Sequence, residues 1–166
     1  MRELMVGAAA GLAATVPMTV AMDVMHRRLP RRQRYPLPPR IIEQRLTRTA
    51  GVEDELDGLD HAGLALAAHF GYGAAAGAMF PVVSRALRGG AVTKGVSYGL
   101  LVWAGSYLGL LPAIGILTPA TEHPRRRNAL MIAAHVVWGG SLGLLAGTAR
   151  PPREGEAPAP PSRDTP

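Results

Sequence analysis

Four polar side chains fall within long apolar stretches of the sequence, and they form the group best suited to chemistry. They are Asp23, His69, Tyr107 and His135. A carboxylate and imidazoles at membrane depth need partners or water, because an unpaired charge there costs at least ~2.5 kcal/mol. Histidine also changes its charge near neutral pH, so this cluster could relay protons or neutralise a cation. One hypothesis is therefore that the protein handles protons or a small solute.

Two other interpretations of the same residues stay open. His69 and His135 could bind the two faces of a haem, with neighbouring glycines leaving room for a flat macrocycle. Alternatively, the imidazoles only form hydrogen bonds across helices and fix their register. We find no phosphate-binding glycine loop followed by Lys-Ser/Thr and no His-Glu-x-x-His motif. The expectation is a protein without enzymatic activity, cofactor or metal.

Four apolar blocks position these side chains, and each is long enough to form a transmembrane helix. They cover residues 4–24, 63–83, 96–117 and 129–149, and Asp23 is the only formally charged residue among them. A bilayer core of about 30 Å requires roughly 20 helical residues. The sequence therefore predicts an all-α membrane bundle of four helices over residues 1–150. A disordered Pro-rich tail is predicted over residues 151–166.

Basic residues are concentrated in two loops, and this asymmetry predicts an orientation. The net charge is +6, with eight arginines between residues 25 and 62, three between 118 and 128, and seven Lys or Arg on the opposite side. The positive-inside rule places both Arg-rich loops in the cytoplasm of a bacterium and both termini outside the inner membrane. These arginines are expected to meet anionic lipid headgroups and not nucleic acid. The absence of cysteine excludes disulfides and thiolate chemistry.

The long loop contains a second predicted element. Residues 40–50 place apolar side chains on one face and charges on others, and Gly51 suits a helix end. This pattern predicts a short amphipathic helix, either at the headgroup level or in an ordinary solvated loop. His61 and His123 lie at loop edges and are expected to be exposed.

Glycines spaced four residues apart occur in every span and predict close helix packing. Lipid offers no hydrophobic gain when apolar helices associate, so small residues that let backbones approach become important. The glycines are Gly7 and Gly11, Gly73 and Gly77, Gly95 and Gly99, Gly105 and Gly109, and Gly139, Gly143 and Gly147. They could serve packing within one chain or a homo-oligomer, and both interpretations stay open. An alternative function follows from them: a structural or interaction subunit that works through these glycine ridges and the basic loop.

The second and fourth spans share a sequence pattern. Ala68-His69-x-x-Tyr72-Gly73-x-x-x-Gly77 corresponds to Ala134-His135-x-x-Trp138-Gly139-x-x-x-Gly143, and a weaker likeness joins the first and third spans. The chain thus reads as two helical hairpins of the same polarity, an arrangement found in transport proteins. Chance repetition among small-residue helices is the alternative.

Three short segments together resemble the YagU-like family of bacterial inner-membrane proteins. They are Pro36-Leu37-Pro38-Pro39-Arg40, Leu117-Thr118-Pro119 and His135-Val136-Val137-Trp138. The resemblance covers most of residues 4–149. It implies a four-span inner-membrane protein of unknown molecular function and supplies no catalytic residue. The chain departs from the family in the Arg-rich run before the first segment and in its Ala/Gly-rich spans.

Overall fold

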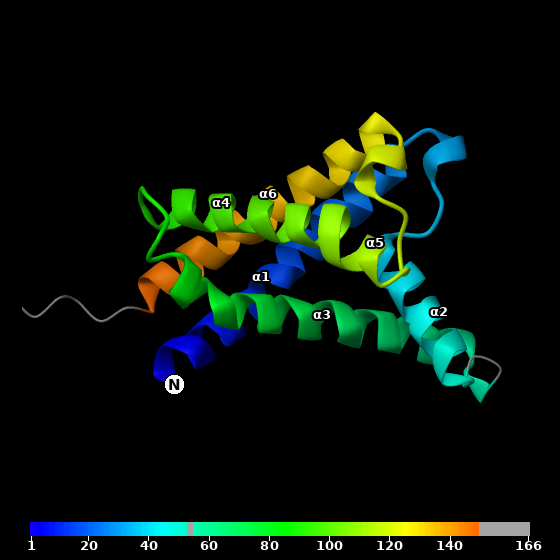
Figure 1. Cartoon of the computed structure of the whole chain (residues 1–166), viewed down its shortest axis with the longest axis horizontal. Coiled ribbons are helices and arrows are strands. Elements are labelled where there is room, and N and C mark those ends of the chain that lie inside the picture. The colour runs from blue at the N-terminus through cyan, green and yellow to red at the C-terminus, as the bar shows by residue number, and fades with distance from the viewer. Residues whose placement is uncertain (53–54, 150–166) are drawn as a thin grey trace, which may run out of the picture.

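The computed structural model describes residues 1–52 and 55–149, and this part of the chain is helical, without strands. Four helical runs are long and apolar enough to cross a membrane: α1 (Arg2–Arg27), α3 (Gly58–Val83), the run Ala91–Ala113 and α6 (Arg125–Thr148) (Figure 1). The predicted all-α bundle of four membrane helices is confirmed. The tail predicted over residues 151–166 lies outside the described residues.

α3 begins five residues before the predicted apolar block because an aspartate caps it. The carboxylate of Asp57 accepts hydrogen bonds from the backbone N–H groups of Leu59, at 2.7 Å, and Asp60, at 2.9 Å. The carboxylate of Asp60 accepts in return from the Asp57 N–H at 3.1 Å. This capping box satisfies donors that a helix start otherwise leaves unpaired, so the helix extends back to Gly58.

The third span is not one uniform α-helix. It consists of α4 (Ala91–Ala104), a π-helical segment η3 (Gly105–Leu110) and α5 (Leu111–Ala113). The span begins after Gly89, whose φ of 101° only glycine adopts readily, and it ends four residues before the predicted boundary. π-Helical segments inside α-helices frequently mark functional sites.

Glycine faces hold the helices together in two hairpins, α1 with α3 and α4 with α6. A Cβ atom added at Gly77 would lie 2.6 Å from the Cα of Gly11, and one added at Gly95 would lie 2.8 Å from the Cα of Gly143. Gly7, Gly73, Gly99 and Gly139 make equally close approaches within the same two pairs, and Gly147 faces Ala91. These glycines therefore serve packing within one chain.

Gly105 and Gly109 differ from the other ridge glycines. A Cβ atom at either position would meet nothing within 4 Å. Both lie in η3, where the wider winding and the weak contact between α3 and α4 leave this glycine pair without a facing helix. Within residues 1–52 and 55–149, no neighbour fulfils the packing role predicted for this pair.

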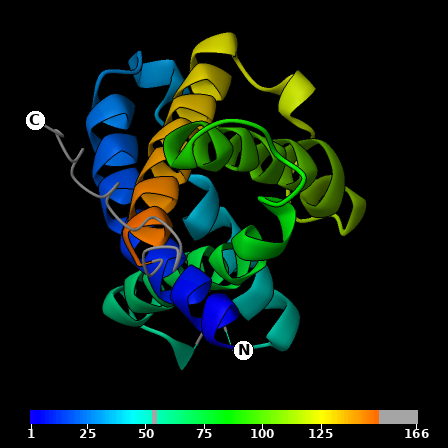
Figure 2. The ribbon, with the colours of Figure 1, turned by 90° about the vertical axis from the view of Figure 1, so that its left-hand side faces the viewer.

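The two hairpins join mainly through one seam. α1 and α6 make extensive contact, whereas α3 and α4 touch at few points. Figure 2 shows α1 beside α6 while α3 and α4 lie well apart. The side of the bundle between α3 and α4 is therefore the side on which a space between the hairpins can form.

Shorter helices cover one end of the bundle: η1 (Arg31–Gln33), α2 (Pro38–Ala50) and η4 (Ala120–Glu122). α2 ends at Gly51, which adopts the left-handed conformation with φ 73°. Glu43 fixes α2 against α3, since its buried carboxylate lies 2.6 Å from the Nδ1 of His61. The helix predicted in this loop thus packs on the bundle.

Candidate functional site

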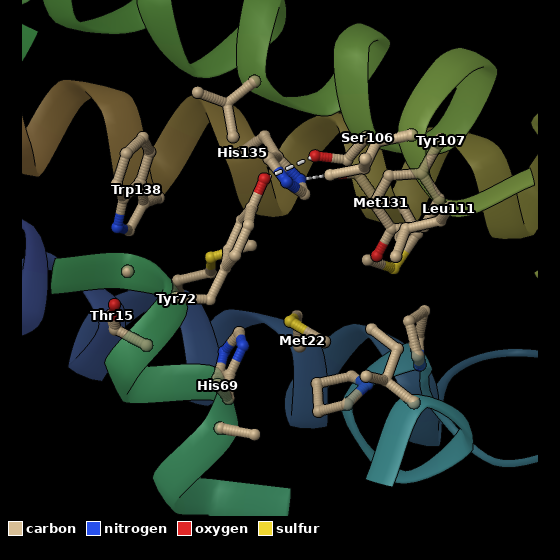
Figure 3. A pocket seen from close by; sticks show the side chains of 18 of the residues that line it. Thr15, Met22, His69, Tyr72, Ser106, Tyr107, Leu111, Met131, His135 and Trp138 are labelled. Atoms are coloured by element: carbon tan, nitrogen blue, oxygen red, sulfur yellow. Dashed lines mark hydrogen bonds between the residues drawn. The ribbon is translucent and has the colours of Figure 1, made fainter. Parts of the chain in front are cut away.

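A cavity of about 310 Å³ lies between the two hairpins, at the end of the bundle that carries α2 (Figure 3). Its lining is predominantly apolar. Met18 and Met22 of α1 and Met131 of α6 line it from the α1–α6 seam. α3 and the α4–α5 run form its flanks, and α2 contributes Ile42 and Leu46. The apolar face predicted for the loop helix is therefore turned toward this cavity.

Three of the four polar residues predicted from the sequence line this cavity together. They are His69 of α3, Tyr107 of the π-helical segment and His135 of α6. They come together because the two helices of each hairpin are antiparallel. The C-terminal part of the first helix therefore lies beside the N-terminal part of the second. The repeated Ala-His pattern places the two histidines at equivalent positions of α3 and α6.

Asp23 is the exception among the four. Its carboxylate is half exposed and lies 2.7 Å from the guanidinium of Arg27, one turn further along α1. The cavity-lining face of α1 carries Thr15, Met18 and Met22. Successive helix residues are rotated by about 100°, so the residue after Met22 points away from that face. Asp23 therefore does not belong to the cluster in which we expected it.

His135 is held rigidly within the cavity wall. Its Nδ1 lies 2.8 Å from the carbonyl oxygen of Met131, and the ring of Tyr107 packs edge-on against it at 5.8 Å between centroids. A carbonyl oxygen can only accept, so Nδ1 carries the proton. In the neutral imidazole the Nε2 atom is then an acceptor.

His69 differs from His135 in its hydrogen bonding. Its Nε2 atom is buried and has no hydrogen-bond partner in the described part of the chain. A buried polar atom without a partner is rare in native structures and points to a missing water, ion or ligand. His69 is therefore the side chain in this cavity that a ligand would complete. Within the described residues no three His, Cys, Asp or Glu side chains gather to hold a metal ion.

One hydrogen bond crosses the cavity between the hairpins. The hydroxyl of Tyr72, on α3, lies 2.6 Å from the Oγ of Ser106 in the π-helical segment (Figure 3). Both residues line the cavity. Tyr72 was not among the predicted site residues. The repeated motif did contain a signal for it, since Tyr72 occupies the position in α3 that Trp138 occupies in α6.

Trp138 makes the corresponding link from the second hairpin to the first. Its Nε1 donates to the carbonyl oxygen of Gly11 at 3.1 Å, and its indole ring lines the inner end of the cavity. The aromatic residue three positions after each motif histidine, Tyr72 or Trp138, thus reaches across to the other hairpin. This correspondence relates the two hairpins in structure as well as in sequence.

A buried arginine fastens the covering segment at this end. Arg127 is 2 % exposed, stacks 3.5 Å above the ring of Tyr35, and donates to the backbone carbonyls of Tyr35 and Pro36. It was grouped with the loop arginines expected at lipid headgroups. That assignment is corrected for Arg127, because the chain folds back over it and satisfies its donors.

The two loop histidines are also more enclosed than expected. The Nδ1 of His123 forms a hydrogen bond with the hydroxyl of Tyr35 at 3.0 Å, and the His123 side chain is half-buried. His61 is 19 % exposed and pairs with Glu43. The prediction that both are exposed was wrong, because the segments bearing Tyr35 and Glu43 cover them.

Two segments of the chain match the Gly-x-Ser-x-Gly spacing of hydrolase nucleophiles, at residues 95–99 and 139–143. In hydrolases this motif forms a sharp turn between a strand and a helix. Here both segments lie inside helices, α4 and α6, and their glycines form the close contacts between those helices. The spacing therefore reflects helix packing.

Comparison with known proteins assigns a family. The sequence matches the family described as "Protein of unknown function (DUF1440)" over residues 24–144. The chain belongs to this family, whose matched region contains the cavity-lining residues of α3, α4 and α6. No curated protein and no solved structure matches the chain.

Proposed function

We propose that this member of the DUF1440 family binds a small apolar molecule with an acidic head group inside the membrane, in the cavity between its hairpins. The observation that carries the proposal is the Nε2 atom of His69, buried in the wall of this cavity without a partner. Apolar pockets of about 300 Å³ or more with a few polar groups are typical binding sites for small molecules. A ligand head group would supply the hydrogen bond that this imidazole lacks.

The charges around the cavity favour an acidic head group. The titratable side chains that line it are two histidines and two tyrosines, and no carboxylate is among its described lining residues. A protonated carboxylic acid can donate to Nε2 of His135 and accept from His69, and an ionised one pairs with an imidazolium. A cationic head group would find no counter-charge. The proposal thus keeps solute handling through the histidines and omits Asp23.

We propose further that the membrane is the bacterial inner membrane, with the α2 end of the bundle in the cytoplasm. The arginines between residues 25 and 52 and between 118 and 128 lie at this end, and the positive-inside rule supports this orientation. The resemblance to the YagU-like family supports the same membrane. A reporter that is active only in the cytoplasm should stay silent when fused to the C-terminus, and an active reporter would reverse the orientation.

Quenching of tryptophan fluorescence tests ligand binding directly. The chain contains two tryptophans, of which Trp138 is 2 % exposed and lines the cavity, while Trp103 does not line it. In the Trp103→Phe protein in lipid nanodiscs, 12-bromododecanoic acid should quench Trp138 with saturation, because bromine must enter the cavity to contact the indole. Replacing His69 with leucine should weaken this binding by at least about tenfold, since a hydrogen bond to a charged group contributes about 1.5 to 3 kcal/mol.

Two comparisons make the experiment selective. The amine with the same chain, 12-bromododecylamine, should quench Trp138 much less, because its head group lacks a partner in the cavity. The His123→Leu protein should bind the acid as the parent does, since His123 does not line the cavity. Quenching that rises linearly without saturation, or equally with acid and amine, would mean partition into lipid and would refute the proposal.

A further inference from the structure

A second cavity lies at the opposite end of the bundle, also between the hairpins. Its volume is about 320 Å³. Val6 of α1, Phe80 of α3, Lys94 of α4 and Gly143 of α6 are among its lining residues. On every one of these helices the residues that line the first cavity lie nearer the α2 end of the bundle than those that line the second, and no residue lines both. The two cavities therefore follow one another along the bundle axis.

A row of three aromatic rings, tilted against one another, lies between the two cavities. Trp138 lines the first cavity and Phe80 lines the second. Tyr98 lies between them, with its ring centroid 6.0 Å from that of Trp138 and 5.4 Å from that of Phe80. All three side chains are buried, and Tyr98 donates from its hydroxyl to the carbonyl oxygen of Ala76 on α3 at 2.7 Å. Along this row, three side chains in contact connect the lining of one cavity to the lining of the other.

The contacts between helices favour movement of whole hairpins at this row of rings. Within each hairpin the backbones touch through glycines, where no side chain can yield. On the open side, α3 and the α4–α5 run are linked by two side-chain hydrogen bonds, Tyr72 with Ser106 and Tyr98 with Ala76. Rocking of one hairpin about the α1–α6 seam would break these bonds and leave the glycine contacts intact, and repeats of transport proteins move in this way.

The second cavity suits the same class of molecule as the first. Its rim carries Arg2 and Lys94, and its carboxylate, Glu3, lies 2.7 Å from the guanidinium of Arg85. Because Glu3 is paired with Arg85, the side chains of Arg2 and Lys94 give this cavity a positive rim. An apolar acid that enters the first cavity would thus find a favourable potential at the far end.

We propose that the two cavities are the ends of one passage for apolar acids across the membrane, with the Phe80–Tyr98–Trp138 row of rings as its gate. This inference rests on the proposed binding function. It adds movement of the bound molecule from one side of the membrane to the other, which binding alone does not require.

The absence of cysteine in the chain gives a direct test. Val102→Cys places a thiol in the first cavity, one helical turn from Tyr98, and Val6→Cys places one in the second. The membrane-impermeant anion 2-sulfonatoethyl methanethiosulfonate, added to one side of sealed vesicles, should label each cysteine from its own side only. Adding Tyr98→Ala to the Val102→Cys protein should open the barrier and raise labelling from the far side by at least about tenfold.

A cationic reagent and a second ring deletion distinguish the possible outcomes of this labelling experiment. The cationic analogue, 2-(trimethylammonio)ethyl methanethiosulfonate, should gain less from Tyr98→Ala because the positive rim repels it. Labelling of both cysteines from the same side would overturn the passage. So would unchanged far-side labelling in the Tyr98→Ala protein when quenching of Trp138 shows that ligand binding is intact. If Tyr98→Ala fails to fold, Phe80→Ala removes the neighbouring ring and decides the question by the same labelling.

Binding and passage can fail separately. Loss of saturable quenching in the parent protein would refute the proposed binding function. Saturable quenching with a barrier that no ring deletion opens would leave binding in place and refute only the passage.

Discussion

The indole Nε1 of Trp138 donates a hydrogen bond to the carbonyl oxygen of Gly11, 3.1 Å away, and this bond joins the two hairpins at their buried seam. The other tryptophan offers a contrast. The Nε1 of Trp103 is buried without a hydrogen-bond partner in the described part of the chain. Two indoles in one bundle therefore differ in whether their polar atom is satisfied.

Trp138→Phe should lower the free energy of unfolding by about 2 kcal/mol, because it removes this bond and leaves a small void. Trp103→Phe should leave the stability unchanged or raise it slightly, since it deletes an unsatisfied buried donor. Titration with sodium dodecyl sulfate in mixed micelles would measure both. Equal losses in the two variants would contradict the difference inferred between the two indoles.

Neighbouring glycines of α6 should respond differently to the same substitution. A Cβ at Gly139 would lie 2.9 Å from the carbonyl carbon of Gly95, whereas a Cβ at Gly140 would meet only the Cγ2 of Val96 at 3.7 Å. Gly139→Ala should cost about 1 to 3 kcal/mol by overpacking. Gly140→Ala should be neutral or stabilise by about 0.5 kcal/mol, because alanine favours the helix. Thermal unfolding in one detergent would rank them, and a tolerated Gly139→Ala would argue against the glycine contact.

Arg127→Lys should loosen the segment that covers the α2 end of the bundle. Lysine keeps the charge but loses the planar group that stacks on Tyr35 and donates to two carbonyls at once. Limited trypsin digestion should cleave between residues 27 and 48 roughly tenfold faster than in the parent protein. Arg126→Lys, at the exposed neighbouring position, is the matched control and should leave the digestion rate unchanged.

The start of α3 should respond to acid. Hydrogen bonds from the N–H groups of Asp60 and Leu59 lower the pKa of Asp57 below its ordinary value of 3.8. A carboxyl with a lowered pKa in the folded state stabilises the protein above that ordinary value, and the contribution is lost as the pH falls through the folded pKa. The stability of the parent should therefore fall between about pH 6 and about pH 3 by more than that of Asp57→Asn, which still caps the helix. Dodecyl sulfate titrations at the two pH values would measure the stability of both proteins. An equal loss of stability in the parent and in Asp57→Asn would contradict this role of Asp57.

Several features of the fold were readable in the sequence because they depend on local composition. Four apolar blocks of membrane length predict four spans whatever their neighbours are. Glycines repeated every four residues mark a face that must approach another helix. The boundaries differ from the prediction, since Asp57 extends α3 through a cap and the third span contains a π-helical segment that no residue pattern predicts.

The candidate site shows where such reasoning ends. The depth of each polar residue along its span could be counted from the sequence, and this count grouped His69, Tyr107 and His135. It could not tell which way a side chain points around its helix, so Asp23 was included although it lies outside the cavity. Tyr72 was missed because its hydrogen bond to Ser106 joins helices whose pairing the sequence leaves open.

By itself the sequence determined the membrane class, the number of spans and the chemical types of the buried polar residues. Those properties follow from hydropathy and residue identity, which need no knowledge of neighbours. Only the tertiary structure decided that the glycine faces close within two hairpins, that α3 and α4 make little contact, and that two cavities with a row of aromatic rings between them form there. These outcomes depend on which helix faces meet, and rotation of a helix about its axis is set by packing across the whole bundle.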